Sequence, residues 1–482
     1  MGTAVEKGKT YSGFFLLSVV LMVVFIITVL MPVEPSDYWT FLRIGDEIVR
    51  TQRIPTTEFM TYTQFGKTAT FSYWLASLLF LEVYKLGGIP LTVMMIGFCI
   101  VAFYTFVWLC LREQKLGPIS ASLILFITAL MGSNNWSTRP QVFAYPLFGL
   151  TLWVLLKWLK RDNRFLFLLP LIAALWVNLH GSFVLQFLLL LAALIFGTGD
   201  RKKLFLMMLF TLAATLLNPF GLQIWMNFFI MVGNPLINAF STEWFPPVNQ
   251  GWQLNLFFAS LLITPFVVYF SPIRGRKLFW AWFFGFGWMA LTGLRFVIWF
   301  SIIEALLLAE LAGPRLNQVL DRRPFFQQKH FNLGVGILLL VFSFTFLPGV
   351  REFWWNQSPP VLTDTTPVDA VGWIDRHPEL PDHLWANWTA SIYMSYALPD
   401  RKVWNTNRIE DFSKEQLADD LKIIHTSYDW QEILDHYQIK SLLLDQKSDE
   451  RLLGAVSGSS SWTEVYRDGR SVVFVSSAGW PP

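Results

Sequence analysis

Long apolar runs separated by short polar loops fill most of the first 349 residues. The first run, from Gly13 to Met31, is too long for the core of a signal peptide, and no small-residue cleavage site follows it. Ten more runs are long enough to cross a bilayer, some only with help from neighbouring helices: residues 89–111, 118–133, 142–160, 165–179, 181–197, 204–217, 252–271, 278–293, 296–313 and 332–348. The pattern predicts a polytopic α-helical membrane protein with about eleven transmembrane helices.

The apolar stretch at 73–87 is shorter, contains Glu82 and Lys85, and ends at a pair of glycines, so we expect it to lie at the membrane interface. With that assignment, 18 basic residues fall in loops on the side of the N-terminus, and seven fall in the opposite loops up to residue 349. Loops rich in Lys and Arg face the cytoplasm. The sequence therefore predicts a multi-pass protein of the plasma membrane, with a cytoplasmic N-terminus and a long extracytoplasmic loop at 33–88.

Residues 350–482 have a different pattern, in which helical and strand-like segments alternate. Helical periodicity falls at 367–376, 413–424 and 428–438, and the strand-like segments read HLWANW, KVWNT, SLLLD, WTEVY and SVVFV. Because the predicted number of spans is odd, this part lies outside the cytoplasm. The sequence predicts two domains, a transmembrane domain at 1–349 and an extracytoplasmic α/β domain at 350–482.

Composition and charge agree with this division. The chain is 54% hydrophobic and 15% charged, whereas about 25% of a soluble domain is charged. Residues 1–349 contain 25 basic and 14 acidic side chains, whereas residues 350–482 contain 12 basic and 20 acidic side chains. These values exclude a soluble globular protein and a disordered chain. The basic residues are spread among short loops, so the charge gives no support for binding to nucleic acid.

Polar and ionisable side chains, which are unfavourable to bury in a membrane, lie in the loops of the predicted outer face near the ends of the spans. Ionisable groups at that depth are functional candidates, because burying them without a partner costs several kcal/mol. The set consists of Glu34, Asp37, Asn134, Asn135, Arg139, Asn178, His180, Asn218, Glu243, Trp244 and Arg295. Together they predict a polar cavity on one face of the membrane.

Each candidate also has a purely structural interpretation. Asp37 precedes the helical pattern YWTFLRIGDEIVR and is a candidate helix cap. Arg139 and Arg295 are long enough to extend to the interface with their charged ends in water. His180 lies in a helix break, where a hydrogen bond within the break would account for it, and Glu243 is equally an ordinary loop acid.

The order of these segments resembles the first outer loop of the C-type (GT-C) glycosyltransferases. The matching segments are PSDYWTFLRIGDEIVRTQRIP and FSYWLASLLF. The later segments STRPQVFAY, WVNLHGSF, LNPFG, TEWFPP, LTGLRF and LPDRKVWNTNRIEDF resemble bacterial membrane proteins placed near that superfamily. The resemblance implies a GT-C-like fold, a polyprenyl-phosphate sugar as donor, and a loop acid beside the reacting sugar.

This resemblance, together with the chemistry of inverting transfer, assigns roles to the candidates. A carboxylate must take the acceptor proton, and cations must stabilise the departing lipid phosphate. Asp37 is the expected base, with Glu34 in reserve, and Arg139 and Arg295 are the expected phosphate ligands. The secondary phosphate-binding candidates are His180 and Lys67, and the residues expected to line the cavity are Asn135, Asn178, Glu243 and Trp244.

The chain also departs from the family pattern. The acidic pair of the family is Asp37-Tyr38 here, and Pro140-Gln141 occupies the position of a second acid. No metal ligand set and no cofactor is therefore predicted, and a divalent cation stays an alternative. Two other classes of function stay open. A non-catalytic scaffold with a degenerate GT-C fold accounts for the missing acid, and a transporter or flippase would more often contain inverted repeats, of which we find none.

Overall fold

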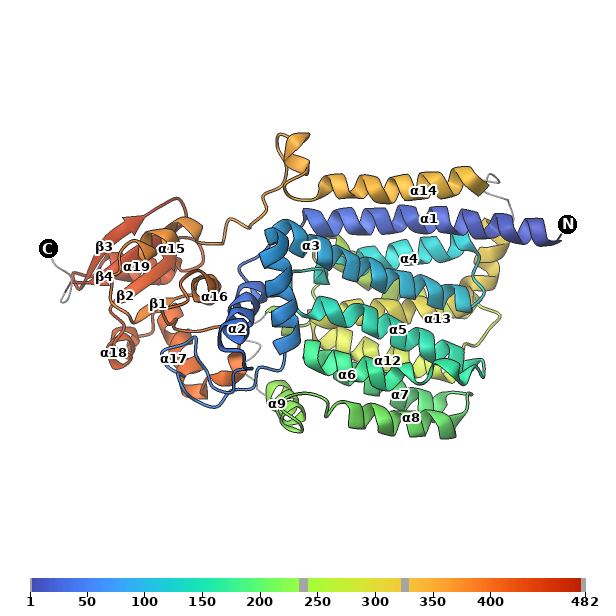
Figure 1. Cartoon of the computed structure of the whole chain (residues 1–482), viewed down its shortest axis with the longest axis horizontal. Helices are drawn as coiled ribbons and strands as arrows, with labels where there is room; N and C mark the ends of the chain where they lie inside the picture. The colour runs from blue at the N-terminus through green and yellow to red at the C-terminus, as the bar shows by residue number, and fades with distance from the viewer. Residues whose placement is uncertain (1, 234–241, 322–328, 478–482) are drawn as a thin grey trace.

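The structure is a computed structural model of the chain, and it describes residues 2–233, 242–321 and 329–477. Helices run side by side in an elongated bundle, and a smaller domain with a β-sheet lies beyond one end of it (Figure 1). The N-terminus lies at the opposite end of the bundle from this C-terminal domain (Figure 1). The two predicted kinds of structure, a helical membrane part and an α/β part, are both present.

Each of the eleven predicted spans contains an α-helix. They are α1 (Gly2–Leu30), α3 (Trp74–Glu113), α4 (Pro118–Gly132), α5 (Gln141–Leu159), α6 (Leu168–Leu179), α7 (Val184–Phe196), α8 (Arg201–Ala214), α11 (Gly251–Phe270), α12 (Lys277–Thr292), α13 (Val297–Leu320) and α14 (Lys329–Ser343). Among the described residues, five helices are long and apolar enough to cross a membrane, namely those that contain Gly13–Leu30, Trp74–Glu113, Gln141–Leu159, Gly251–Phe270 and Leu294–Leu320. The remaining predicted spans form shorter helices, packed against these five.

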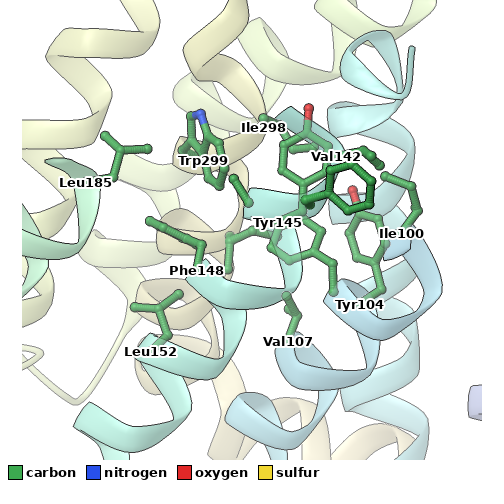
Figure 2. Packing of buried hydrophobic residues seen from close by; sticks show 14 of the residues in the cluster. Ile100, Tyr104, Val107, Val142, Tyr145, Phe148, Leu152, Leu185, Ile298 and Trp299 are labelled. Atoms are coloured by element: carbon green, nitrogen blue, oxygen red, sulfur yellow. The ribbon is translucent and has the colours of Figure 1, made fainter. Parts of the chain in front are cut away.

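Aromatic and aliphatic side chains pack against one another in the core of the bundle (Figure 2). The ring centroids of Phe148 and Trp299 lie 4.8 Å apart, and Tyr145 lies 5.1 Å from the same indole. At Gly149, an added Cβ would lie 2.9 Å from Cβ of Phe106, so only glycine lets α3 and α5 approach this closely. Close packing of this kind replaces the hydrophobic effect as the force between helices in lipid.

The end of the bundle beside the N-terminus carries the basic loops. Both Lys157 and Lys160 form ion pairs with Glu113, at 2.5 and 2.6 Å. The Asp321 carboxylate accepts hydrogen bonds from the backbone N–H groups of Ile119 and Ser120, and so satisfies free donors at the start of α4. These contacts tie the loops of this end together.

At the other end, α3 bends sharply. Gly87 and Gly88 have non-helical backbone angles, and Gly88 has φ 62° and ψ −154°, a region open essentially to glycine alone. The residues before the bend, predicted from sequence to lie at the interface, form a helical segment that crosses the end of the bundle (Figure 1). Helix α2 (Asp37–Thr51) packs on this segment, and a Cβ at Gly45 would lie 2.5 Å from the Ser77 carbonyl oxygen.

The C-terminal domain contains a four-stranded sheet in the order β1-β2-β4-β3. The strands are β1 (Leu384–Ala386), β2 (Ser441–Asp445), β3 (Trp462–Arg467) and β4 (Ser471–Ser476), with β1 parallel to β2 and the other pairs antiparallel. Its helices are α15 (Val368–Asp375), α16 (Trp388–Ala397), α17 (Lys414–Ile424), α18 (Trp430–His436) and α19 (Glu450–Ser457). Two of these, α16 and α19, are absent from the sequence prediction, and the other three fall where it placed them.

The expected strand KVWNT is not part of the sheet. Instead, Val403 forms a single bridge with Thr61 of the outer loop, and its N–H donates to the Met60 carbonyl at 2.9 Å. The segment is extended, as its residues predict, but its partner is the long loop after α1. This pairing fixes the C-terminal domain on the loop.

Candidate functional site

Two adjoining cavities lie at the end of the bundle that faces the C-terminal domain, which contributes Glu410 to both of them. One has a volume of about 680 Å³ and the other of about 100 Å³. They share seven lining residues: Tyr73, Gln141, His180, Met231, Trp244, Arg295 and Glu410. Because the same side chains face both, the cavities form one continuous site.

The large cavity is mainly apolar. Its walls come from α7, α12 and the short helix α9 (Gln223–Val232), and include Leu185, Leu188, Phe228 and Trp288. Trp288 is 73% exposed on the outer surface of the bundle, and Leu188 is 41% exposed. The wall of the large cavity therefore extends to the outer surface of the helical bundle, which is the lipid-facing surface in a membrane protein. A long hydrocarbon chain fits the chemistry of this cleft.

The small cavity is polar, and it gathers five side chains that the sequence scatters over separate loops. Asp37, Arg139, His180, Glu243 and Arg295 all line it. They are positioned by the ends of α2, α5, α6 and by the 3-10 helices η4 (Thr242–Trp244) and η5 (Leu294–Phe296). Helix ends suit such a site, because their free backbone groups already require polar surroundings.

Asp37 is the first residue of α2, and Ser36 precedes it as the N-cap without a side-chain hydrogen bond. The Asp37 carboxylate Oδ1 accepts a hydrogen bond of 2.8 Å from Nδ2 of Asn407 in the C-terminal domain. Its described partner is therefore a side chain across the cavity and not the backbone of its own helix. The positive end of the α2 dipole stabilises the charged carboxylate at this position.

The two arginines of the cavity differ in their partners. Arg139 forms an ion pair with Glu243, which neutralises its charge, although its Nε is buried without a hydrogen-bond partner. Arg295 lies over the ring of Trp244, with its guanidinium carbon 4.5 Å from the ring centroid. Among the residues that the structure describes, no carboxylate forms an ion pair with Arg295. It is therefore the cation best placed to receive an anionic group.

His180 follows α6 and begins the turn into the 3-10 helix η3 (Gly181–Phe183). The Ser182 N–H donates to Nδ1 of His180 at 3.1 Å, so in the neutral ring Nε2 carries the proton. Burial, with a smaller contribution from the charge of Arg295, lowers the pKa of His180 to about 3. The imidazole is therefore neutral and offers an N–H donor to the cavity.

Four of the residues that were assigned a role in the site do not line either cavity, and neither do the other two predicted residues, Asn134 and Asn218. Glu34 and Lys67 are exposed, and the Lys67 ammonium donates to Gln64 at 2.8 Å. Asn178 is buried, where it accepts from the indole of Trp74 and donates to backbone carbonyls. Asn135 donates to its neighbour Asn134. These residues stabilise loops and helix ends near the site, while Trp244 lines both cavities as expected.

The C-terminal domain contributes residues that the sequence prediction missed. Asn407, Arg408 and Glu410 line the small cavity, from a segment that includes the 3-10 helix η8 (Ile409–Asp411). The motif NTNRIEDF was the signal available in the sequence, since it concentrates polar residues between two apolar segments. Its link to the cavity depends on the docking of one domain on the other, which sequence spacing does not reveal.

The described residues contain no group of three or more His, Cys, Asp or Glu side chains placed to hold a metal ion.

No protein-family model and no curated protein sequence matches the chain. Solved structures of membrane glycosyltransferases do match it. The oligosaccharyltransferase of Archaeoglobus fulgidus has a TM-score of 0.63 at 13% identity, over 97% of this chain and 74% of the other.

Two further structures agree. The mycobacterial arabinofuranosyltransferase AftD gives a TM-score of 0.54 at 13% identity, over 95% of this chain and 41% of its own. ArnT from Cupriavidus metallidurans in the apo state gives a TM-score of 0.50 at 13% identity, over 97% of this chain and 98% of its own. The chain has the GT-C fold. This confirms the fold predicted from the sequence, and with the apolar helices it assigns the protein to a membrane.

Proposed function

We propose that the protein is a membrane glycosyltransferase that moves a sugar from a polyprenyl-phosphate donor to an acceptor outside the cytoplasm. The observation that carries this proposal is the joining of two unlike cavities. A polar cavity adjoins a large apolar cleft, and it holds a carboxylate and Arg295, with which no carboxylate of the described residues forms an ion pair. A lipid-linked sugar has the same division into a long apolar chain and a charged, hydroxylated head.

The donor lipid would occupy the large cleft with its phosphate at the junction of the two cavities. Arg295 supplies the positive charge there, and its planar guanidinium suits phosphate oxygens. The Nε2–H of His180 and the free Nε–H of Arg139 are further donors for the same group. An Archaeoglobus fulgidus oligosaccharyltransferase of the same fold, with a TM-score of 0.59, has been solved in complex with a dolichol-phosphate. A lipid phosphate at this site is consistent with that complex.

In the proposed reaction, Asp37 acts as the general base. The acceptor hydroxyl attacks the anomeric carbon of the sugar while its proton passes to the Asp37 carboxylate. The bond between that carbon and the phosphate oxygen breaks, and its electron pair goes to the lipid phosphate. Asn407 holds the carboxylate in place through the 2.8 Å hydrogen bond to Oδ1.

The location of the site supports a lipid-linked donor. Helix α2, which begins at the cavity residue Asp37, lies at the end of the bundle opposite the N-terminus (Figure 1). The basic loops favour a cytoplasmic N-terminus under the rule for positive charge. The site would then face a compartment without sugar nucleotides. A transferase working there needs a donor that the membrane itself delivers.

The substitution Asp37→Asn tests the assignment of the base. It keeps the size of the side chain and an oxygen for the Asn407 hydrogen bond but removes the proton-accepting charge. We expect transfer to fall about 10²- to 10⁴-fold, the usual contribution of a positioned base, with little change in lipid binding. The measurement is release of polyprenyl phosphate from synthetic polyprenyl-phosphate monosaccharides in membranes that contain the acceptor.

Glu34→Gln is the matched control, because Glu34 is exposed three residues away and lines neither cavity. This variant should transfer sugar at the wild-type rate. If Asp37→Asn also did so, Asp37 would have only a structural role. Absence of release from the wild-type protein with every donor would instead favour a non-catalytic scaffold.

A further inference from the structure

Glu410 lies at the junction of the two cavities and lines both of them. Arg295 lies at the same junction, so Glu410 faces the position proposed for the donor phosphate. Its side chain is 19% exposed and comes from the C-terminal domain, on η8. A carboxylate at this position requires an explanation, because two anions would repel each other there.

The carboxyl group of Glu410 has two described partners, the guanidinium of Arg408 and its own backbone N–H. Arg408 makes two hydrogen bonds to Asp411, at 2.6 and 3.0 Å, and a third to the Thr70 carbonyl oxygen at 3.2 Å. Its guanidinium also stacks on Phe71, 4.1 Å from the ring centroid. Glu410 forms an ion pair with the same guanidinium at 3.6 Å, which is too long for a hydrogen bond. The segment around Glu410 is therefore held by Arg408, and a carboxyl group can accept or donate further hydrogen bonds beyond the one from its own N–H.

The charges around Glu410 come from several elements. Burial raises the pKa of Glu410 to about 7, against the opposite effect of Arg408, and Asp411 and Asp37 raise it further. The His180 imidazole is neutral, as shown above, and Arg139 is paired with Glu243. The charged and titratable groups that line the cavities or contact Arg408 and Asp411 are Asp37, Glu58, Tyr73, Arg139, His180, Glu243, Arg295, Arg408 and Asp411.

We propose that Glu410 is a second catalytic residue, which in its neutral form donates a hydrogen bond to the donor phosphate and gives its proton to the departing lipid phosphate. This proposal rests on the function proposed above. A neutral carboxyl group that is largely buried from bulk water is a strong donor to an anionic oxygen. If Glu410 were ionised, Arg295 would share the cavity with two carboxylates, those of Asp37 and Glu410. The three charges together would then have no net positive charge to attract the phosphate.

The step balances without any further reactant. The acceptor O–H proton goes to Asp37, and the electron pair of the broken carbon–oxygen bond goes to the phosphate. Glu410 then transfers its proton to that phosphate, which leaves as the monoanion of the lipid phosphate. Glu410 is now a carboxylate and Asp37 is protonated, and transfer of the proton from Asp37 to Glu410, directly or through water, restores the starting state.

The test uses the full chain in phosphatidylcholine nanodiscs and undecaprenyl phosphate methyl ester as the probe. This phosphodiester keeps a single negative charge across the pH range, so changes in binding with pH arise from the protein. The wild-type protein should bind the probe tightly below about pH 7, where Glu410 is protonated. Affinity should then fall as pH rises, by up to about tenfold per pH unit.

Glu410→Gln should remove this pH dependence, because the amide stays neutral and still donates an N–H. Its affinity at high pH should exceed that of the wild type, while its transfer rate falls because the amide has no proton to give. The exposed Glu432→Gln, in α18, should keep the wild-type profile. A variant with a structural defect alone would lose binding at every pH.

Two results would overturn the role of Glu410 alone: a wild-type affinity that does not change between pH 6 and pH 8.5, or a Glu410→Gln affinity that still falls. The wild-type profile decides the matter even if the variant does not fold. Failure of the proposed function has a separate signature. In that case the wild-type protein would not bind the probe at any pH, or Arg295→Gln would bind it as well as the wild type.

Discussion

Arg139 and Arg295 carry the same charge at the same cavity, but their neighbours give them different capacities. Arg139 is paired with Glu243, whereas Arg295 lies against Trp244 and no described carboxylate forms an ion pair with it. The sequence marked both as phosphate ligands, and it marked Glu243 as a cavity residue, but it did not connect the pair. At the scale of single residues, the side chain that contacts each arginine decides which of the two positive charges is available to a ligand.

Substituting each arginine with glutamine should separate these roles. Arg295→Gln should weaken binding of a polyprenyl phosphate about tenfold to 100-fold, because it removes a charge-assisted hydrogen bond of about 1.5–3 kcal/mol. Arg139→Gln should weaken binding less, since its charge is already neutralised, and combining it with Glu243→Gln should restore part of the loss. Equilibrium binding to the purified variants measures both effects. Equal losses from the two single substitutions would contradict the difference in partners.

At the scale of elements, the bend in α3 positions much of the site. The segment before Gly88 crosses the end of the bundle, supports α2 with Asp37, and begins beside Tyr73 in the cavity wall. The sequence indicated this change of direction by two charged residues and a glycine pair. It did not reveal that two helical segments meet directly at Gly87 and Gly88, where the backbone angles are non-helical.

Gly88→Ala should destabilise the protein by about 1–3 kcal/mol, because φ 62° with ψ −154° is strained for any residue with a Cβ. Transfer activity should fall with it, since the crossing segment carries α2. Gly285→Ala in α12 is the control, because an added Cβ there meets nothing within 4 Å and the residue is exposed. Thermal unfolding of the two variants in the same detergent compares them. Similar midpoints would show that the bend tolerates a side chain.

At the scale of the whole molecule, the C-terminal domain completes the polar cavity by docking on the long outer loop. Val403 pairs with the backbone of Met60 and Thr61, and Arg408 reaches the Thr70 carbonyl oxygen. Trp39 of α2 packs edge to face on Tyr393 of the domain, at a centroid distance of 5.0 Å. Asn407 and Glu410 reach the membrane-side residues through these contacts.

The proposed sidedness of the molecule follows from this arrangement and can be tested in whole cells. In a chain without Cys99 and Cys110, a cysteine at the exposed Ser457 should react with an impermeant thiol reagent. A cysteine at the exposed Lys202, in the basic first turn of α8, should react only after the cells are opened. The reverse pattern would place the cavity in the cytoplasm and remove the reason for a lipid-linked donor.

The sequence by itself determined the helices of the bundle and the α/β character of the C-terminal domain. These follow from local hydrophobic periodicity, which the apolar core of a membrane makes unusually clear. It also identified Asp37, His180 and Arg295, because a charged or polar side chain stands out against apolar surroundings. Such signals are local, and each can be found within one segment of the chain.

Only the tertiary structure decided which of these groups meet. Lys67 is exposed and donates to Gln64 of its own loop, and the side chain of Asn178 bonds to the backbone of Leu217 instead of lining the cavity. Glu410 lies 373 positions after Asp37 in the chain yet lines the same cavity. Contacts of this kind depend on the docking of separately formed elements, and the energy of docking is spread over many side chains. The pattern within any one segment does not contain that information.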